Sequence, residues 1–246
     1  MGLKFSIPYQ IPFYETDITH HVKLPHLLAF SLQVSGMQSE SLGNTDKDVF
    51  DNYGLVWIVT DYAIEIDRLP RYNEKVTITT EAISYNKIFC YRNFYITDEA
   101  GQQIMLFKTT FALMDYETRK VAEVPDEVVA PYGADKIKKL LRGPRYKTLE
   151  NPLEILYRVR YFDLDMNGHV NNSKYLEWML DVFDLDFLTE YTPDIDLKYV
   201  KEIHHGSKIY SGYEFDQGSL SSQHQICVDG NVHAQAIIQW KEIGDE

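Results

Sequence analysis

Apolar residues along the chain recur with two spacings, one typical of strands and one typical of helices. Residues 61–67 alternate strictly, with Tyr62, Ile64 and Ile66 set against Asp61, Glu65 and Asp67. This alternation predicts a strand with one buried face. Between about Leu24 and Leu42 the pattern predicts a helix, with Pro25 in its first turn and Gly43 as its stop.

Turn residues separate further alternating runs and predict antiparallel hairpins. Residues 87–97 and 102–114 are joined through Asp-Glu-Ala-Gly, and residues 220–228 and 231–241 are joined through Asp-Gly-Asn. A strand containing Phe5 precedes the first helix. One helix followed by a run of hairpins indicates the α+β class, with an antiparallel sheet that wraps the helix.

The chain also repeats itself. The segment YETDITHHV at 14–22 matches FDLDMNGHV at 162–170, an offset of 148 residues. Three polar positions correspond across the repeat: Asp17, Thr19 and His21 in the first copy, and Asp165, Asn167 and His169 in the second. A stripe with helical spacing follows the second copy, at Leu176, Met179, Leu180, Phe183 and Phe187. Each half therefore predicts a strand, a loop, one long helix and several antiparallel strands.

The stretch PYGADKIKKLLRGPRYKTLENP, at 131–152, interrupts this pattern with proline, glycine and basic charge. It predicts a short helix and a linker. We expect an N-terminal domain at 1–135, a linker at 136–150 and a C-terminal domain at 151–246.

Charge and composition exclude several classes of protein. The 246 residues carry a formal net charge of −13, which argues against nucleic acid and against an anionic membrane surface as partners. No apolar run approaches the ~18 residues that a membrane-spanning helix needs. Cys90 and Cys227 match no metal or redox spacing, and so few cysteines indicate a reducing compartment.

Three segments carry a resemblance to a known family. DLDMNGHVNNSKY at 163–175, VWIVTDYAIEIDRLPRYNEKVTITT at 56–80 and DYETRKVAEVPDEV at 115–128 resemble blocks of the acyl-acyl carrier protein (acyl-ACP) thioesterases. These are plant fatty-acid-releasing enzymes with bacterial relatives, and the likeness covers nearly the whole chain. It implies a double hot-dog fold and hydrolysis of a fatty acyl thioester on acyl carrier protein, without a cofactor. It also implies bacterial cytoplasm, because the plant enzymes carry a plastid-targeting extension and this chain starts directly on a strand.

The resemblance places functional residues at Asp165, Asn167 and His169, and at a later glutamate, Glu202. Plant members have a cysteine after that glutamate, where this chain has Ile203. A cysteine-based covalent mechanism is therefore excluded at this position. In the first copy Leu69 aligns with Glu202, so that copy is interpreted as a site that has lost catalysis.

Thioester hydrolysis needs an activated water, a stabilised oxyanion and a leaving thiol. We expect backbone N–H groups and the dipole of the following helix to stabilise the oxyanion, with Gly168 allowing a tight backbone approach. The Asn167 side chain is expected to donate to the carbonyl or to orient the water. Glu202 is the first choice as general base and Asp165 the second, while His169 orients this pair or shuttles the proton.

Structural roles without chemistry remain open for each of these residues. Asp165 fits a helix cap, Asn167 an Asx turn, His169 a half-buried histidine and Glu202 an exposed strand residue. The pairs His20-His21 and His204-His205 do not indicate a metal, since no acidic or cysteine partner has metal-ligand spacing.

Partner and substrate are the remaining open questions. Residues 136–147 hold six cations, which either steer the acidic carrier protein or belong to a solvated linker helix. Alternative functions are an acyl-CoA thioesterase of the same fold, a hydroxyacyl-thioester dehydratase and a non-catalytic acyl-thioester sensor. The chain is expected to be a monomer or a homodimer.

Overall fold

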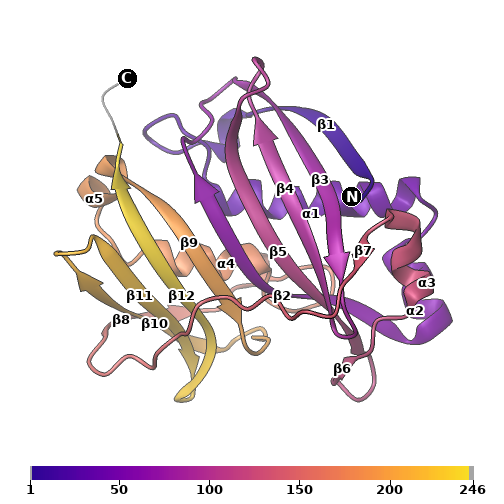
Figure 1. The fold of residues 1–246 in the computed structure, drawn as a ribbon. Coiled ribbons are helices and arrows are strands. Elements are labelled where there is room, and N and C mark those ends of the chain that lie inside the picture. The colour runs from indigo at the N-terminus through magenta and orange to yellow at the C-terminus, as the bar shows by residue number, and fades with distance from the viewer. Residues whose placement is uncertain (1, 244–246) are drawn as a thin grey trace. The chain divides into compact units, whose positions relative to one another are not determined.

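The structure is a computed structural model and describes residues 2–243 (Figure 1). Its contacts divide the chain into two compact units. Unit 1 comprises Met1–Asp61 and Asp67–Arg142, and unit 2 comprises Tyr62–Ile66 and Gly143–Glu246. The unit boundary falls after Arg142, and the domain limits expected at 1–135 and 151–246 stay predictions.

Unit 1 is an antiparallel sheet with its long helix. In chain order its elements are β1 (Lys4–Gln10), α1 (Leu24–Ser41), α2 (Asp46–Tyr53), β2 (Leu55–Ile66), β3 (Lys75–Tyr85), β4 (Phe89–Thr97), β5 (Gln103–Asp115), β6 (Val121–Ala122), α3 (Asp126–Val129) and β7 (Asp135–Lys136). The strand order is β1-β3-β4-β5-β2, and short β6 and β7 pair with β5 and β3. Two 3₁₀ turns, at Phe13–Glu15 and Ala130–Tyr132, complete the unit.

Helix α1 lies behind the strands of this sheet (Figure 1) and confirms the helix predicted from about Leu24 to Leu42. Leu27, Leu28 and Val34 are completely buried and fill the space between helix and sheet. The hydroxyl of Ser31 donates back to the Leu27 carbonyl at 2.8 Å, so this buried polar group is satisfied within the helix.

Unit 2 repeats the arrangement with a shorter helical part. Its elements are β8 (Leu153–Arg158), a 3₁₀ turn (Tyr161–Asp163), α4 (Asn172–Leu180), α5 (Leu185–Glu190), β9 (Tyr191–Tyr199), β10 (Lys208–Asp216), β11 (Ser221–Val228) and β12 (Asn231–Glu242). The strand order is the last five residues of β2, then β9-β12-β11-β10-β8. The predicted hairpins at 220–228 and 231–241 are confirmed by the antiparallel pairing of β11 with β12.

The prediction of one long helix in the second half is wrong. Helix α4 ends at Leu180, and Asp184 begins α5 by accepting a hydrogen bond from the Phe187 amide at 2.9 Å. Aspartate is a better cap than a helix-interior residue, so Asp184 favours a new start. Phe183, between the helices, contacts the Phe187 and Trp240 rings at centroid distances of 4.6 and 4.9 Å.

The short helix predicted within 131–150 is also largely absent. Beyond a 3₁₀ turn at Ala130–Tyr132, the segment 137–150 has no helix or strand. Residues 135–136 instead pair with β3, and the Ile137 amide donates to the Tyr85 carbonyl at 2.8 Å. These bonds use backbone groups that a helix would need, and Pro144 lacks a donor. Among residues 2–243, no helix has the length and apolar character needed to cross a bilayer.

Candidate active site

The polar loop before α4 is closed by the carboxylate of Asp165. Its Oδ1 accepts from the backbone N–H groups of Asn167 at 2.8 Å and of His169 at 3.2 Å. Gly168 takes a φ of 80°, the left-handed region that glycine adopts without strain. A Cβ at Gly168 would meet nothing within 4 Å, so within the protein the glycine serves the turn, and a close approach of substrate to its backbone stays a prediction.

Unit 1 contains the same loop with the same hydrogen bonds. Oδ1 of Asp17 accepts from the Thr19 amide at 2.8 Å and from the His21 amide at 3.2 Å. His20 stands at the position of Gly168 and also has a positive φ, 64°. The repeat seen in the sequence is therefore confirmed as a repeat of backbone geometry.

Backbone pairing brings the polar loop before α4 to the segment after β9. The Val170 amide donates to the Ile203 carbonyl at 3.0 Å, and the backbones of His169 and His204 form an isolated antiparallel β-bridge. As a result, Nε2 of His169 lies 3.4 Å from Oε2 of Glu202. The two side chains are 28% and 38% exposed, so solvent and substrate can reach both. Ile203 is buried in the core, and its aliphatic side chain offers no nucleophile next to Glu202.

Asn167 differs from its counterpart Thr19 in how its side chain is used. The Thr19 hydroxyl donates to Oδ1 of Asp17 at 2.7 Å and lies 2.9 Å from Nδ1 of His21. The Asn167 side chain is exposed, and within residues 2–243 it has no hydrogen-bond partner. Its amide is therefore free to bind a substrate oxygen, whereas the threonine is engaged in its own loop.

Backbone amides of the loop are less available than the sequence predicted. The N–H groups of Asn167, Gly168, His169 and Val170 all donate to acceptors within the protein. These four groups are therefore engaged within the protein, whereas the Asn167 side chain is a donor without a partner among residues 2–243, and stabilisation of an oxyanion by the loop backbone stays a prediction. The helix cap is Asn171, whose Oδ1 accepts from the Ser173 amide at 3.0 Å, so Asp165 is not the cap.

A histidine on β12 supports the segment that carries Glu202. Nδ1 of His233 donates to the carbonyl oxygens of Glu202 at 3.0 Å and Lys201 at 3.3 Å. His233 is buried, and this burial lowers its pKa, so the ring is neutral near pH 7. Sequence reasoning missed His233 because it lies on another strand, with no local spacing to Glu202.

Tyr175 was also missed, although it belongs to the same motif. Its side chain is 3% exposed, and its hydroxyl receives a hydrogen bond from the Ile203 amide. Burial raises the pKa of Tyr175 well above its usual range, and the charges of Glu202 and Asp165 raise it further. A neutral phenol therefore lies close to both carboxylates.

The equivalent position in unit 1 has no carboxylate. The Val22 amide donates to the Pro70 carbonyl at 2.8 Å, the counterpart of the bond between Val170 and Ile203. This register places Leu69 where unit 2 has Glu202. Nε of Arg71 lies 3.4 Å from Nε2 of His21, so this histidine faces a cation where His169 faces a carboxylate.

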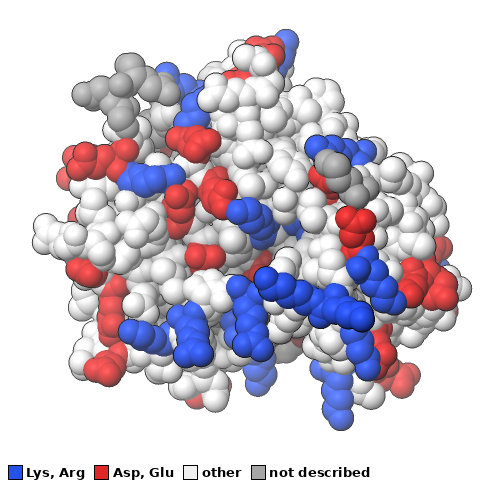
Figure 2. All heavy atoms as spheres, viewed as in Figure 1, with Lys and Arg blue, Asp and Glu red and all other residues white. Residues whose placement is uncertain are grey.

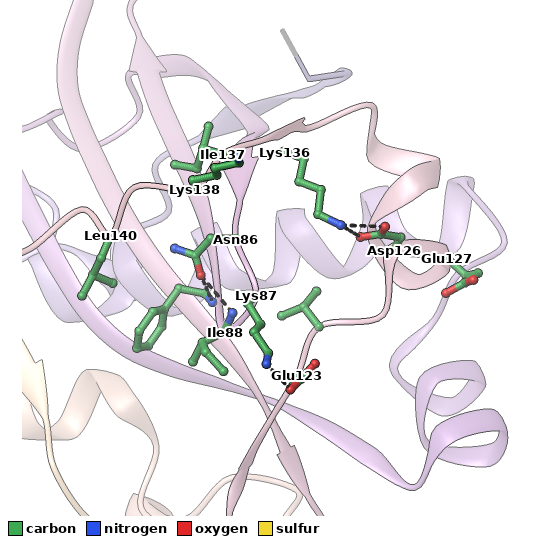
Figure 3. Close-up of a pocket in the computed structure, with 12 residues that line it drawn as sticks. Asn86, Lys87, Ile88, Glu123, Asp126, Glu127, Lys136, Ile137, Lys138 and Leu140 are labelled. Carbon is green, nitrogen blue, oxygen red and sulfur yellow. Dashed lines mark hydrogen bonds and ion pairs between the residues drawn. The ribbon is translucent and has the colours of Figure 1, made fainter.

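Unit 1 also has a surface groove of about 770 Å³, away from the polar loop in sequence (Figure 3). Residues 86–89, 123–127 and 136–140 contribute its lining. Lys136 reaches Asp126 at 2.7 Å, and Lys87 reaches Glu123 at 2.5 Å. Four of its charged side chains are thus paired with one another, and none of the predicted site residues lines it. Within residues 2–243, no cluster of histidine, cysteine and acidic residues is suited to a metal ion.

Comparison with protein families gives two matches that together span most of the chain. The acyl-ACP thioesterase N-terminal domain matches residues 2–132, and the acyl-ACP thioesterase C-terminal domain matches residues 146–242. A chloroplastic acyl-[acyl-carrier-protein] hydrolase of Cuphea viscosissima is 25% identical over 85% of this chain and 54% of its own length. A palmitoyl-acyl carrier protein thioesterase of Cuphea hookeriana is 25% identical over 98% of this chain and 63% of its own length. The chain thus spans between half and two thirds of these relatives.

Solved structures show the same fold. A candidate oleoyl thioesterase from Lactobacillus plantarum superposes with a TM-score of 0.92 and 32% identity, over 99% of this chain and 98% of the other. The 12:0-ACP thioesterase of Umbellularia californica superposes with a TM-score of 0.86 and 20% identity, over 99% of both chains, which shows the fold alone. The double hot-dog fold expected from the sequence is confirmed.

Proposed function

Because the chain belongs to the acyl-ACP thioesterase family, we propose that it hydrolyses fatty acyl-ACP to a free fatty acid and the carrier thiol. The observation that carries this proposal is the contact between His169 and Glu202 at 3.4 Å, with the unengaged amide of Asn167 two residues before His169 in the same loop. A carboxylate, an imidazole and an amide donor are the groups that water attack on a thioester requires.

In the proposed reaction, Glu202 takes a proton from water as the water oxygen attacks the thioester carbonyl carbon. The carbonyl oxygen becomes an oxyanion, which accepts a hydrogen bond from Nδ2 of Asn167. When the tetrahedral intermediate collapses, the carbon–sulfur bond breaks. The proton held by Glu202 then passes to the leaving sulfur, directly or through His169, and the carboxylate is restored.

We assign the base to Glu202 rather than to Asp165 because Asp165 already shapes the loop. Oδ1 of Asp165 accepts two backbone hydrogen bonds, and protonation would weaken both at each turnover. The backbone carbonyl of Glu202 accepts from His233, and its carboxylate lies 3.4 Å from Nε2 of His169, the group through which a proton can pass on.

Replacing Glu202 with glutamine tests the assignment of the base. We expect E202Q to lower kcat by ~10²–10⁴-fold, because the amide is similar in shape but cannot accept the proton. The measurement is steady-state hydrolysis of acyl-ACP, with circular dichroism as a check of folding. Glu177, which is 37% exposed and paired with Lys174, offers a matched control, and E177Q should keep the wild-type rate. Wild-type kcat in E202Q would remove Glu202 as the base.

Replacing Asn167 with alanine tests the oxyanion donor. We expect N167A to lower kcat by ~10²–10³-fold with a smaller change in KM, because the donor acts mainly on the developing charge. Thr19 occupies the same loop position in unit 1, and T19A should leave kcat unchanged. If N167A raises KM and preserves kcat, Asn167 is a binding residue and not an oxyanion donor.

The same assays separate the proposed function from its alternatives. Equal kcat/KM on acyl-CoA and acyl-ACP would indicate an acyl-CoA thioesterase of this fold. Formation of an enoyl thioester from a hydroxyacyl thioester would indicate a dehydratase, and tight acyl-ACP binding without turnover would indicate a sensor. A cytoplasmic location and a monomeric or homodimeric state stay predictions.

The basic stretch at 136–147 contributes long-range attraction in this proposal. Lys136 is paired with Asp126, but five further cations are exposed: Lys138, Lys139, Arg142, Arg145 and Lys147. Figure 2 shows Lys and Arg side chains gathered in the lower part of the face in view, where Figure 1 draws the chain between β7 and β8. On an otherwise acidic protein, such a stretch favours approach of an acidic carrier.

A further inference from the structure

Two cations face each other across neighbouring strands of unit 2. Arg158 ends β8, Lys208 begins β10, and the two are directly opposite in the antiparallel register. Opposed residues of such a pair point to the same side of the sheet, with Cβ atoms about 5 Å apart. Both side chains are exposed, and within residues 2–243 neither has an ion-pair partner.

Folding alone does not explain this arrangement. Like charges directly opposite each other destabilise a strand pair, and among residues 2–243 no carboxylate forms an ion pair with either cation to offset the repulsion. The equivalent pair in unit 1 is Gln10 opposite Lys75, with the same register between β1 and β3. Gln10 is neutral and donates to Oδ1 of Asn73 at 2.7 Å. The doubled positive charge therefore belongs to the unit that carries Glu202, and it favours binding of an anionic group.

Short segments of chain connect Arg158 and Lys208 to the polar loop before α4. The Val159 amide donates to the Ser207 carbonyl at 3.0 Å, and the 3₁₀ turn at Tyr161–Asp163 then leads into the loop. On the β10 strand, Lys208 follows the turn that contains His204, whose backbone forms a β-bridge with that of His169. Lys201, next to Glu202, is a third exposed cation without an ion-pair partner among the described residues. The positive charge thus borders the site.

Large apolar side chains are exposed on the same loop. Phe162 is 87% exposed, and Met166, between Asp165 and Asn167, is 99% exposed. The ring of Tyr161 contacts Phe162 edge-on at a centroid distance of 5.2 Å and is exposed as well. Apolar side chains bordered by unpaired cations fit a protein surface that offers acidic and apolar groups together, more than they fit a free phosphate.

We propose that Arg158, Lys208 and Lys201, with Phe162 and Met166, form the docking surface for the acidic acyl carrier protein. This inference rests on the proposed function and adds the place where the carrier sits while its thioester reaches Glu202. The cations contact acidic side chains of the carrier, and the apolar residues cover its apolar contact area. The stretch at 138–147 acts at longer range and is not part of this surface.

The test is charge reversal of the opposed pair in the full-length protein. We expect R158E/K208E to raise KM for acyl-ACP by ~10-fold or more at low salt, because the carrier meets repulsion where it met attraction. Hydrolysis of acyl-pantetheine, which has no carrier protein, should keep its wild-type kcat/KM. The milder variant R158Q, which copies unit 1, should show a smaller rise, and K75E in unit 1 should show none.

Binding of carrier protein without an acyl chain separates this inference from the proposed function. Calorimetric titration of wild type and R158E/K208E with apo-carrier should show ~10-fold weaker binding by the variant, whether or not hydrolysis occurs. Equal affinities would overturn the docking surface, and so would an equal loss of activity on acyl-ACP and acyl-pantetheine. Normal carrier binding by a wild-type protein that hydrolyses no acyl-ACP would overturn the proposed function alone.

Discussion

At the scale of single residues, the buried tyrosine hydroxyls fall into two groups, those with a hydrogen-bond partner and those without one among residues 2–243. The Tyr175 hydroxyl accepts a hydrogen bond from the Ile203 amide, and the Tyr199 hydroxyl donates one to the Asn172 carbonyl at 2.8 Å. The Tyr62 hydroxyl is buried and, within residues 2–243, has no hydrogen-bond partner. A satisfied hydroxyl holds its neighbours in place, whereas an unsatisfied one only carries a desolvation cost.

Removing the hydroxyl of Tyr175 and removing that of Tyr62 should therefore affect the free energy of unfolding differently. We expect Y175F to lower the free energy of unfolding by about 1–3 kcal/mol, because the Ile203 amide loses its acceptor, and to lower kcat through displacement of Glu202. We expect Y62F to leave stability unchanged or to raise it. Urea denaturation and acyl-ACP hydrolysis measure both effects. A larger loss of stability in Y62F than in Y175F would contradict this account.

The sequence predicted which polar residues lie near one another better than it predicted what each one contacts. The repeat and the resemblance indicated Asp165, Asn167, His169 and Glu202, and the structure brings His169 and Glu202 together. The loop-closing role of Asp165 depends on which backbone amides turn toward its carboxylate, and spacing does not contain that information. His233 was invisible because hydrogen bonds from a distant strand leave no local pattern.

At the scale of elements, the polar loop of each unit depends on one left-handed position. Gly168 and His20 occupy it in the two units, with φ values of 80° and 64°. Free space around Gly168 means that a side chain there meets no steric obstacle, so any cost of substitution arises in the backbone. Strand alternation and hairpin turns were predictable because they are local. The break between α4 and α5 also has a local signal, the cap residue Asp184, but the apolar stripe continues through the break and conceals it.

Substitution of Gly168 should separate backbone strain from steric clash. We expect G168A to destabilise the protein by about 1–2 kcal/mol, since alanine is disfavoured in the left-handed region. Asparagine tolerates that region better, so G168N should cost less. Thermal or urea unfolding of both variants gives the comparison, and equal costs for alanine and asparagine would argue against backbone strain.

At the scale of the whole molecule, a buried histidine links stability to pH. His224 on β11 is 1% exposed, and burial lowers its pKa from 6.5 to about 3. Its Nε2 contacts the Ser222 hydroxyl at 2.7 Å, and its ring stacks on Tyr213 at 6.0 Å. Because the unfolded chain binds a proton below pH 6.5 and the folded protein does not, stability is full above 6.5 and falls as pH decreases toward 3.

Replacing His224 with glutamine should reduce this dependence. Between pH 7 and pH 5 we expect His224 to cost the wild type about 2 kcal/mol of unfolding free energy, an amount that H224Q does not lose. Urea titrations at the two pH values measure the difference. Poorer packing of glutamine lowers the free energy of unfolding at every pH. The quantity to compare is therefore the slope of the unfolding free energy with pH, not its value at pH 7. Identical slopes would show that His224 takes up its proton as readily in the folded protein as in the unfolded chain.

Strand β2 has a consequence for any attempt to cut this chain in two. Its last five residues, Tyr62–Ile66, belong to unit 2, where the Ile66 amide donates to Oδ1 of Asp194 at 2.8 Å. Lys241 also reaches the carbonyl of Ile66 and the carboxylate of Asp194. A fragment starting at Gly143 lacks this strand, so β9 becomes an open edge prone to aggregation. A soluble fragment of unit 2 therefore needs residues 62–66 restored, for example as a peptide added in trans.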